Sequence, residues 1–134
     1  MAEQIKFTIP GQPKYATMVR LAVGSIATEA GFSVEDVEDI KVATEEACKS
    51  ICCHGNVGFP SKMEIDCQVE EGRIEVKVMD KSEGLSTEKI EQICMDCPSE
   101  GDLSLCIIQS LMTEVEVQTR AQGEKFIRLV KTRG

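Results

Sequence analysis

Short segments in which apolar and polar residues alternate constrain the fold of this 134-residue chain most strongly. A strand with this pattern buries one face only, as in a sheet that is covered on one side. Turns at Gly72 and Gly123 each separate two such segments, which predicts two hairpins. The alternating segments are residues 5–9, 63–69, 74–78, 115–117 and 126–130.

Two longer segments carry apolar residues at helical spacing. The first extends from Tyr15 to Gly31, a residue type that commonly ends a helix. The second begins after Ser33, where Asp36 follows three positions later in the manner of a capping box, and ends near Gly55. The other predicted elements are a short helix at 87–94, an irregular loop at 95–102 and a helix buried on nearly all sides at 103–112.

These elements predict one α+β domain covering residues 1–134. Because each alternating strand buries a single face, we expect a two-layer sandwich with helices on one face of a mostly antiparallel mixed sheet. A chain of this length is large enough to bury a core without disulfides.

The charge of the chain excludes several classes of partner. The formal net charge is -8 and the pI is near 4.7, whereas nucleic acid and anionic membranes attract basic surfaces. No apolar run approaches the roughly 20 residues of a membrane span. The N-terminus lacks the basic and apolar regions of a signal peptide, so we expect a cytoplasmic protein. The seven cysteines are then expected to be reduced thiols.

Three polar side chains recur at four-residue spacing in the second predicted helix. Glu46, Ser50 and His54 therefore project from one face, among residues that are otherwise mostly apolar or small. This alignment indicates a site. A glutamate on the solvated flank of a helix is the alternative interpretation of Glu46, and His54 could instead close the helix end.

The same segment resembles the first motif of the anti-sigma-factor serine kinases, which belong to the histidine-kinase-like (GHKL) ATPase superfamily. That motif is approximately E-A-x-x-N-A-x-x-H-G; Glu46-Ala47 and His54-Gly55 match it, and Ser50 replaces the asparagine. Further similarity follows in the family's order at residues 9–13, 19–21, 34–43 and 111–117.

The resemblance implies a site for ATP and Mg²⁺ on the helix side of the sheet. Glu46 corresponds to the general base that polarises a substrate serine hydroxyl. No resident metal site is assigned. The implied cofactor-binding residues are Ser50 and His54 at the Mg²⁺ and phosphate region, Asp80 and Gly84 at the adenine, and Gly101 and Ser104 at the phosphates.

Several residues depart from the family's motifs. Ser50 has a shorter side chain than the asparagine that holds Mg²⁺, and Ser82 replaces the first glycine of the adenine motif D-x-G-x-G. In the phosphate motif, Asp102 and Ser104 replace glycines, and the aspartate adds negative charge beside the phosphates. No Lys or Arg occurs between Lys89 and Arg120. We therefore expect nucleotide affinity to be weakened or lost.

The cysteines suggest a separate hypothesis, a zinc site or a redox dithiol. Soft ligands for tetrahedral zinc are present if two segments meet, although consecutive cysteines do not easily direct their side chains at one ion. Buried or idle thiols are the default expectation. The candidate ligands are Cys52, Cys53, His54, Cys94 and Cys97, whereas Cys48, Cys67 and Cys106 occupy apolar patterns typical of a core.

The resemblance implies an anti-sigma regulatory factor that acts in transcription regulation by partner switching. Such proteins bind a sigma factor or similar regulator, phosphorylate a serine of a small antagonist protein, and often form dimers. Arg20 is a candidate partner contact on the first predicted helix. The alternative is a non-catalytic protein-binding module with the same fold that no longer binds ATP, so the sequence leaves enzymatic activity open.

Overall fold

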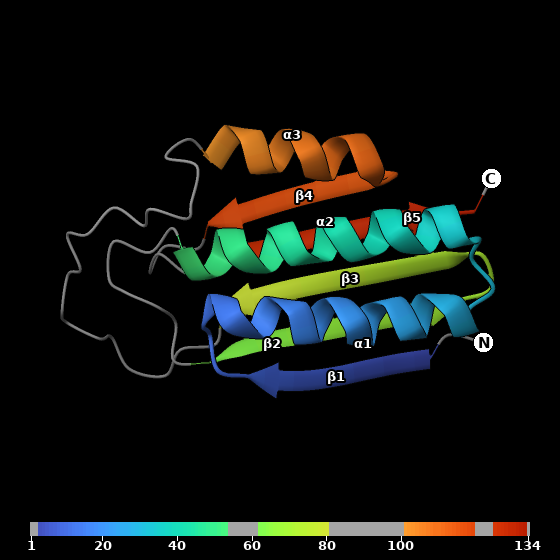
Figure 1. The fold of residues 1–134 in the computed structure, drawn as a ribbon, viewed down its shortest axis with the longest axis horizontal. Coiled ribbons are helices and arrows are strands. Elements are labelled where there is room, and N and C mark those ends of the chain that lie inside the picture. The colour runs from blue at the N-terminus through green and yellow to red at the C-terminus, as the bar shows by residue number, and fades with distance from the viewer. Residues whose placement is uncertain (1–2, 54–61, 81–100, 120–124, 134) are drawn as a thin grey trace, which may run out of the picture.

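A computed structural model describes residues 3–53, 62–80, 101–119 and 125–133 (Figure 1). Its elements follow one another as β1 (Glu3–Ile9), the 3-10 turn η1 (Pro13–Tyr15), α1 (Ala16–Glu29), α2 (Val34–Cys53), β2 (Met63–Glu70), β3 (Arg73–Asp80), α3 (Gly101–Leu111), β4 (Glu114–Thr119) and β5 (Lys125–Thr132).

The five strands form one sheet in the order β1-β2-β3-β5-β4. All four pairs of neighbouring strands are antiparallel, so no parallel pair of the predicted mixed sheet occurs among the described strands. Both predicted hairpins are present, with Val115 opposite Leu129 and Val117 opposite Ile127 in the second. The helices cover one face of this sheet, which confirms the predicted α+β sandwich (Figure 1).

The core lies between α1, α2 and the covered face of the sheet. Ile40 of α2 and Ile65, Val76 and Leu129 of the sheet are fully buried. Thr44 is also fully buried, and its hydroxyl donates to the Ile40 carbonyl oxygen at 2.7 Å. This polar group is therefore satisfied inside its own helix, at little cost to the apolar layer.

Local signals in the sequence fix the ends of the elements. The Ser33 hydroxyl accepts a hydrogen bond from the Asp36 backbone N–H at 3.1 Å, as the capping pattern predicts. Gly31 and Gly72 have φ values of +89° and +76°, a region that glycine adopts without steric cost. Arg133 joins these two turns, because its backbone N–H donates to the Gly72 carbonyl and its guanidinium to the Gly31 carbonyl.

The structure corrects two expectations about α3. It begins at Gly101, inside the predicted irregular loop, because the residues after this glycine continue the helical spacing. The expected burial on nearly all sides is also wrong: Ile108 is buried, but Gln109 and Ser110 are exposed. A helix at the end of a single helical layer buries one face, however apolar its sequence.

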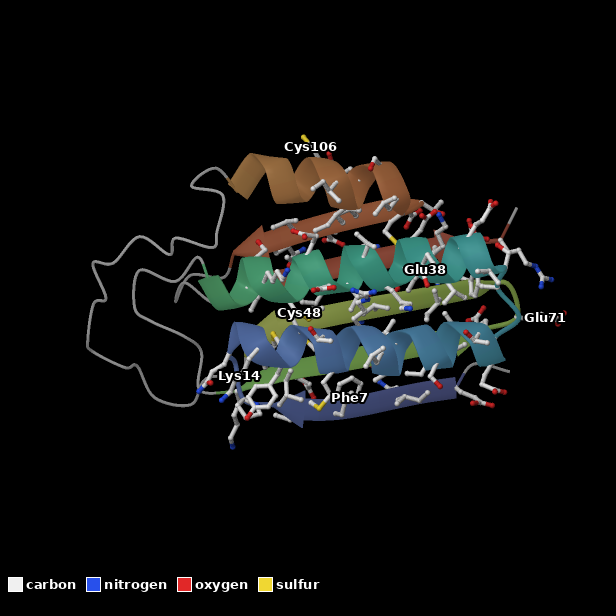
Figure 2. All side chains as sticks on the ribbon, viewed as in Figure 1. Phe7, Lys14, Glu38, Cys48, Glu71 and Cys106 are labelled. Atoms are coloured by element: carbon white, nitrogen blue, oxygen red, sulfur yellow. The ribbon has the colours of Figure 1, made fainter. Side chains whose placement is uncertain are left out.

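The cysteine predictions are partly confirmed. Cys48 and Cys67 are buried in the core, and burial, with a smaller contribution from Asp66, raises the pKa of the Cys67 thiol to about 12. Cys106 was expected in the core but is exposed, on the side of α3 that faces away from the sheet (Figure 2). The predicted helix at 87–94 and the side chains of the proposed zinc ligands lie outside the described residues.

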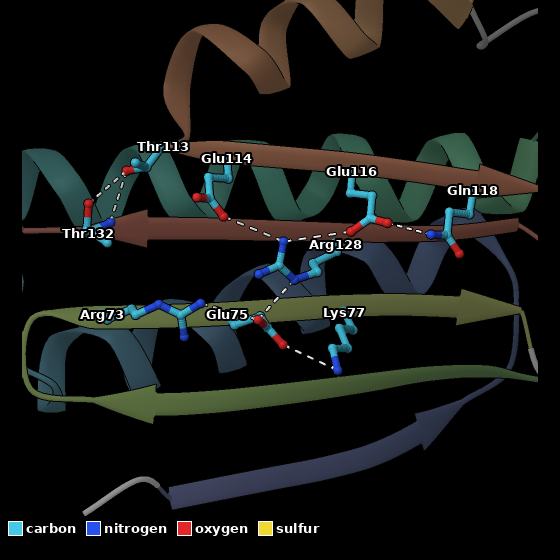
Figure 3. A network of polar contacts seen from close by, with 9 residues as sticks. All are labelled: Arg73, Glu75, Lys77, Thr113, Glu114, Glu116, Gln118, Arg128 and Thr132. Atoms are coloured by element: carbon cyan, nitrogen blue, oxygen red, sulfur yellow. Dashed lines mark hydrogen bonds and ion pairs between the residues drawn. The ribbon is translucent and has the colours of Figure 1, made fainter.

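The other face of the sheet carries an ionic network centred on Glu75 (Figure 3). Although burial raises the pKa of Glu75, hydrogen bonds from Arg128 and Lys77 outweigh that effect and hold the pKa below its ordinary value. The Glu75 carboxylate lies 3.0 Å from Arg128 Nε, 3.3 Å from Lys77 Nζ and 3.5 Å from Arg73 Nη2. The network joins β3 to β5 on the face that no helix covers.

Candidate functional site

Three elements that carry predicted site residues meet at one end of the molecule. Helix α2 and strand β3 both end there, and α3 begins there (Figure 1). The chain thus brings one helix C-terminus, one strand end and one helix N-terminus together, although long stretches of sequence separate them.

Glu46 and Ser50 lie on the C-terminal half of α2, and both are partly buried. Their four-residue spacing places them on one face, next to Ala47 and Cys48, which are fully buried. A carboxylate and a hydroxyl therefore lie at the margin of the core. Each can exchange hydrogen bonds with a ligand there.

The remaining predicted residues lie on other elements. Asp80 is the last residue of β3 and pairs with Met63 at the start of β2. Gly101 and Ser104 belong to the first turn of α3, whose leading N–H groups have no partner within the helix. His54 and Gly84 lie outside the described residues.

The N-terminus of α3 suits an anionic ligand on general grounds. The unpaired N–H groups and the positive end of the helix dipole both attract negative charge. The side chains of this first turn, Asp102 and Ser104 included, lie outside the described residues, so the predicted weakening of phosphate binding stays a prediction.

An ion-pair cluster beside Glu46 was not predicted from the sequence. Arg20 of α1 contacts Glu45 of α2, with 3.0 Å between Nη1 and Oε2, and Lys49 Nζ lies 3.3 Å from the other Glu45 oxygen. Burial raises the pKa of Glu45, but the hydrogen bonds from Arg20 and Lys49 exceed that effect and lower it overall. Arg20, the candidate partner contact, is thus paired with α2, and its side chain remains 36% exposed.

Part of this cluster has a sequence signal. Glu45 and Lys49 are four residues apart, the spacing at which opposite charges meet on a helix. The pairing with Arg20 spans 25 residues and depends on how α1 packs on α2, so no local pattern indicates it.

The side-chain oxygens at this end are of the chemical type that binds Mg²⁺ and a nucleotide. Carboxylate and hydroxyl oxygens, such as those of Glu46 and Ser50, are the ligands that Mg²⁺ prefers over nitrogen or sulfur. Among the described residues, no three His, Cys, Asp or Glu side chains form a group that could hold a metal by themselves.

A comparison with protein families matches residues 9–131 to the histidine kinase-like ATPase domain. The chain belongs to this family. The match covers every element described above except β1, of which only Ile9 is included, and the last residue of β5.

Relatives of known name support the same assignment. Proteins named serine-protein kinase RsbW match from Bacillus velezensis, with 31% identity over 89% of this chain and 80% of the relative, and from Bacillus subtilis, with 30% identity over 90% and 81%. The RsbW of Bacillus pumilus is 33% identical over 87% of this chain and 79% of that protein.

A solved structure confirms the fold independently. The crystal structure of the RsbU and RsbW domains of a Mycobacterium tuberculosis protein superposes with a TM-score of 0.71 and 18% identity over 97% of this chain. This chain spans 32% of that solved chain. The superposition agrees with the sequence relationship, which extends over nearly the same residues.

None of the helices that the structure describes is both long enough and apolar enough to cross a bilayer.

Proposed function

We propose that this protein is an anti-sigma regulatory factor with an ATP site of the serine-kinase type, acting by partner switching in transcription regulation. The observation that carries the proposal is the match to proteins named serine-protein kinase RsbW, at about 30% identity over about nine-tenths of this chain. The meeting of α2, β3 and α3 at one end of the molecule supports it, because five of the seven candidate site residues lie on these elements: Glu46, Ser50, Asp80, Gly101 and Ser104.

Each proposed residue has a role that suits its chemistry. ATP, when bound, supplies the phosphoryl group that is transferred. The Glu46 carboxylate accepts the proton of the substrate serine hydroxyl, which requires a partly exposed base at the edge of the core. Ser50 and His54 border the Mg²⁺ and phosphates, Asp80 and Gly84 contact the adenine, and Gly101 and Ser104 lie at the phosphates.

We propose two protein partners, one that is bound reversibly and one that is phosphorylated. A sigma factor or similar regulator is bound and released, and a small antagonist protein receives the phosphate on a serine. The acidic surface, with a net charge of -8, suits protein partners with basic patches rather than nucleic acid. A homodimer is proposed from the resemblance alone.

A second candidate function is a protein-binding module that keeps the fold without using ATP. The substitutions Ser50, Ser82 and Asp102 favour it, since each removes a feature that the family's motifs use for metal, adenine or phosphate. The absence of Lys and Arg between Lys89 and Arg120 adds to it, because cations normally neutralise a triphosphate.

Calorimetric titration with Mg-ATP separates the two functions. Micromolar affinity supports the kinase, whereas no heat of binding at millimolar nucleotide supports the module. The catalytic assignment is then tested by transfer of labelled phosphate to a candidate antagonist protein. Glu46→Gln should abolish transfer and leave Mg-ATP affinity nearly unchanged, because the amide keeps the shape but cannot accept the proton. Equal loss of binding and transfer would show that Glu46 is not the base.

A further inference from the structure

A groove of about 590 Å³ lies at the opposite end of the molecule from Glu46 and Asp80. It is bounded by the last turn of α1, the beginning of β1 and the turn between β2 and β3, where Figure 2 places Glu71. None of these segments carries a residue of the proposed ATP site. The groove is therefore separate from that site.

The floor of the groove is apolar and incompletely covered. Ile5, Ile26 and Val69 line it, and Ile5 is 36% exposed although it faces the helical layer. Along β1 the helix-facing side chains become less exposed toward Ile9, which is 5% exposed. Helix α1 lies over β2, beside the edge strand β1 (Figure 1), so the helical layer covers the start of β1 incompletely.

The rim of the groove is acidic, with carboxylates from Glu3, Glu29, Glu70 and Glu71. None of the four makes a hydrogen bond or an ion pair with any residue that the structure describes. The C-terminal end of α1 adds the negative end of a helix dipole. No lining residue is basic.

Basic residues of the adjoining turns are engaged elsewhere. Arg73 lies 3.5 Å from the Glu75 carboxylate on the other face of the sheet. Arg133 donates through Nη1 to the carbonyl oxygen of Gly31 at 3.2 Å. The negative potential of the rim therefore remains available to a ligand.

Strand β1 is also an edge of the sheet, because β2 is its only neighbour among the described strands. The backbone N–H and C=O groups on its other side can pair with an additional strand. An extended segment placed there directs alternate side chains toward the helical layer, where the apolar floor lies.

We propose that this groove binds an extended basic segment of a partner protein, one in which apolar residues alternate with Lys or Arg. The apolar side chains contact Ile5, Ile26 and Val69, and the cations meet the carboxylates of the rim. A second copy of this chain is a poor occupant, because symmetric docking brings two sets of four unpaired carboxylates together. Charge complementarity thus selects a basic partner.

The test uses a short labelled peptide that alternates valine with lysine, measured by fluorescence anisotropy at low and physiological salt without nucleotide. The expected result is binding whose affinity falls as salt is added. At one salt concentration, the variant Glu3→Gln/Glu29→Gln should bind the peptide about fivefold more weakly than the wild type, since two exposed ion pairs are lost. The matched control is Glu114→Gln/Glu116→Gln, which changes the net charge equally on β4, the opposite edge of the sheet. The control should bind like the wild type.

Two further measurements locate the peptide and test the floor. Methyl resonances of Ile5, Ile26 and Val69 should shift on titration, and a peptide with serine in place of valine should bind several-fold more weakly. Equal weakening by both double variants, or unshifted methyl groups, would overturn the proposal. So would sedimentation showing a dimer of the free protein that Glu3→Gln/Glu29→Gln strengthens, because the occupant would then be a second copy. Since no nucleotide is present, failure here is distinct from failure of the kinase proposal.

Discussion

The ionic network on the open face of the sheet should make a measurable contribution to stability through Glu75. The Glu75 side chain is 9% exposed and accepts from Arg128 at 3.0 Å, with longer contacts to Lys77 and Arg73. Glu75→Gln keeps the volume but removes the charge. A hydrogen bond between charged groups contributes about 1.5–3 kcal/mol when it is buried, and the longer contacts to partly exposed cations contribute less.

We expect Glu75→Gln to lower the free energy of unfolding by about 2 kcal/mol at neutral pH, as measured by urea denaturation followed by circular dichroism. The loss is moderated because Arg128 retains contacts with Glu114 and Glu116 at 3.6 and 3.8 Å. The control is Glu35→Gln, an exposed helical residue, which should change stability by no more than about 0.5 kcal/mol.

The pH dependence of this difference tests its electrostatic origin. The folded-state pKa of Glu75 is depressed below its ordinary value of 4.5, so its stabilisation is present above that value and lost as pH falls through the folded-state pKa. The wild type should therefore lose stability in acid more steeply than Glu75→Gln. The two free energies of unfolding should then converge. A difference that stays constant from neutral pH into acid would refute the reasoning, because it would indicate a packing effect instead.

Three other substitutions test the packing of the helices and the proposed metal site. A Cβ atom at Gly24 would lie 2.7 Å from Lys41 Cδ, so Gly24→Ala should lower the free energy of unfolding by about 1 kcal/mol. In a Lys41→Ala background the clash is absent and only helix propensity acts, so the same substitution should stabilise the fold. A change in the free energy of unfolding with the same sign in both backgrounds would contradict this. Lys131→Met should cost about 1–2 kcal/mol in urea denaturation, because Lys131 Nζ donates to the Leu111 carbonyl at 2.5 Å; an unchanged midpoint would show that this bond is dispensable. Ser50→Asn should raise Mg-ATP affinity measured by calorimetry if the longer amide reaches the metal, and equal affinities would exclude Ser50 from the metal region.

Local patterns in the sequence were sufficient for the described strands and for α1 and the start of α2, but not for the start of α3. The hydroxyl of Ser33 and the N–H of Asp36 are three residues apart, so the cap could be predicted before any tertiary contact was known. The turn at Gly72 could be predicted from the alternation on both sides of it. These features depend on neighbours in the chain, and their physical causes act over a few residues.

Features that depend on packing were predicted poorly. The apolar composition of α3 indicated burial, but the place of this helix at the end of the layer leaves Cys106 exposed. The contact of Glu75 with Arg128 spans 53 residues and requires the register of β3 on β5. The candidate site residues are indicated by similarity to the family's motifs. The contact of Arg20, a candidate partner contact, with Glu45 could not be predicted, because Glu45 lies on another helix.

Helix α1 carries residues of the acidic groove and a residue, Arg20, beside the proposed nucleotide site, and it separates the two sites by its length. Arg20 contacts α2 next to Glu46, whereas Ile26 and Glu29 line the acidic groove. At about 1.5 Å per residue, Glu29 lies about 14 Å along the helix from Arg20. This distance exceeds the screening length of about 8 Å at physiological salt, so a charge bound in the groove has little direct effect on the ion pairs beside Glu46. Coupling between groove and nucleotide site through α1 would therefore require movement of α1 against α2, where Gly24 and Lys41 are in close contact.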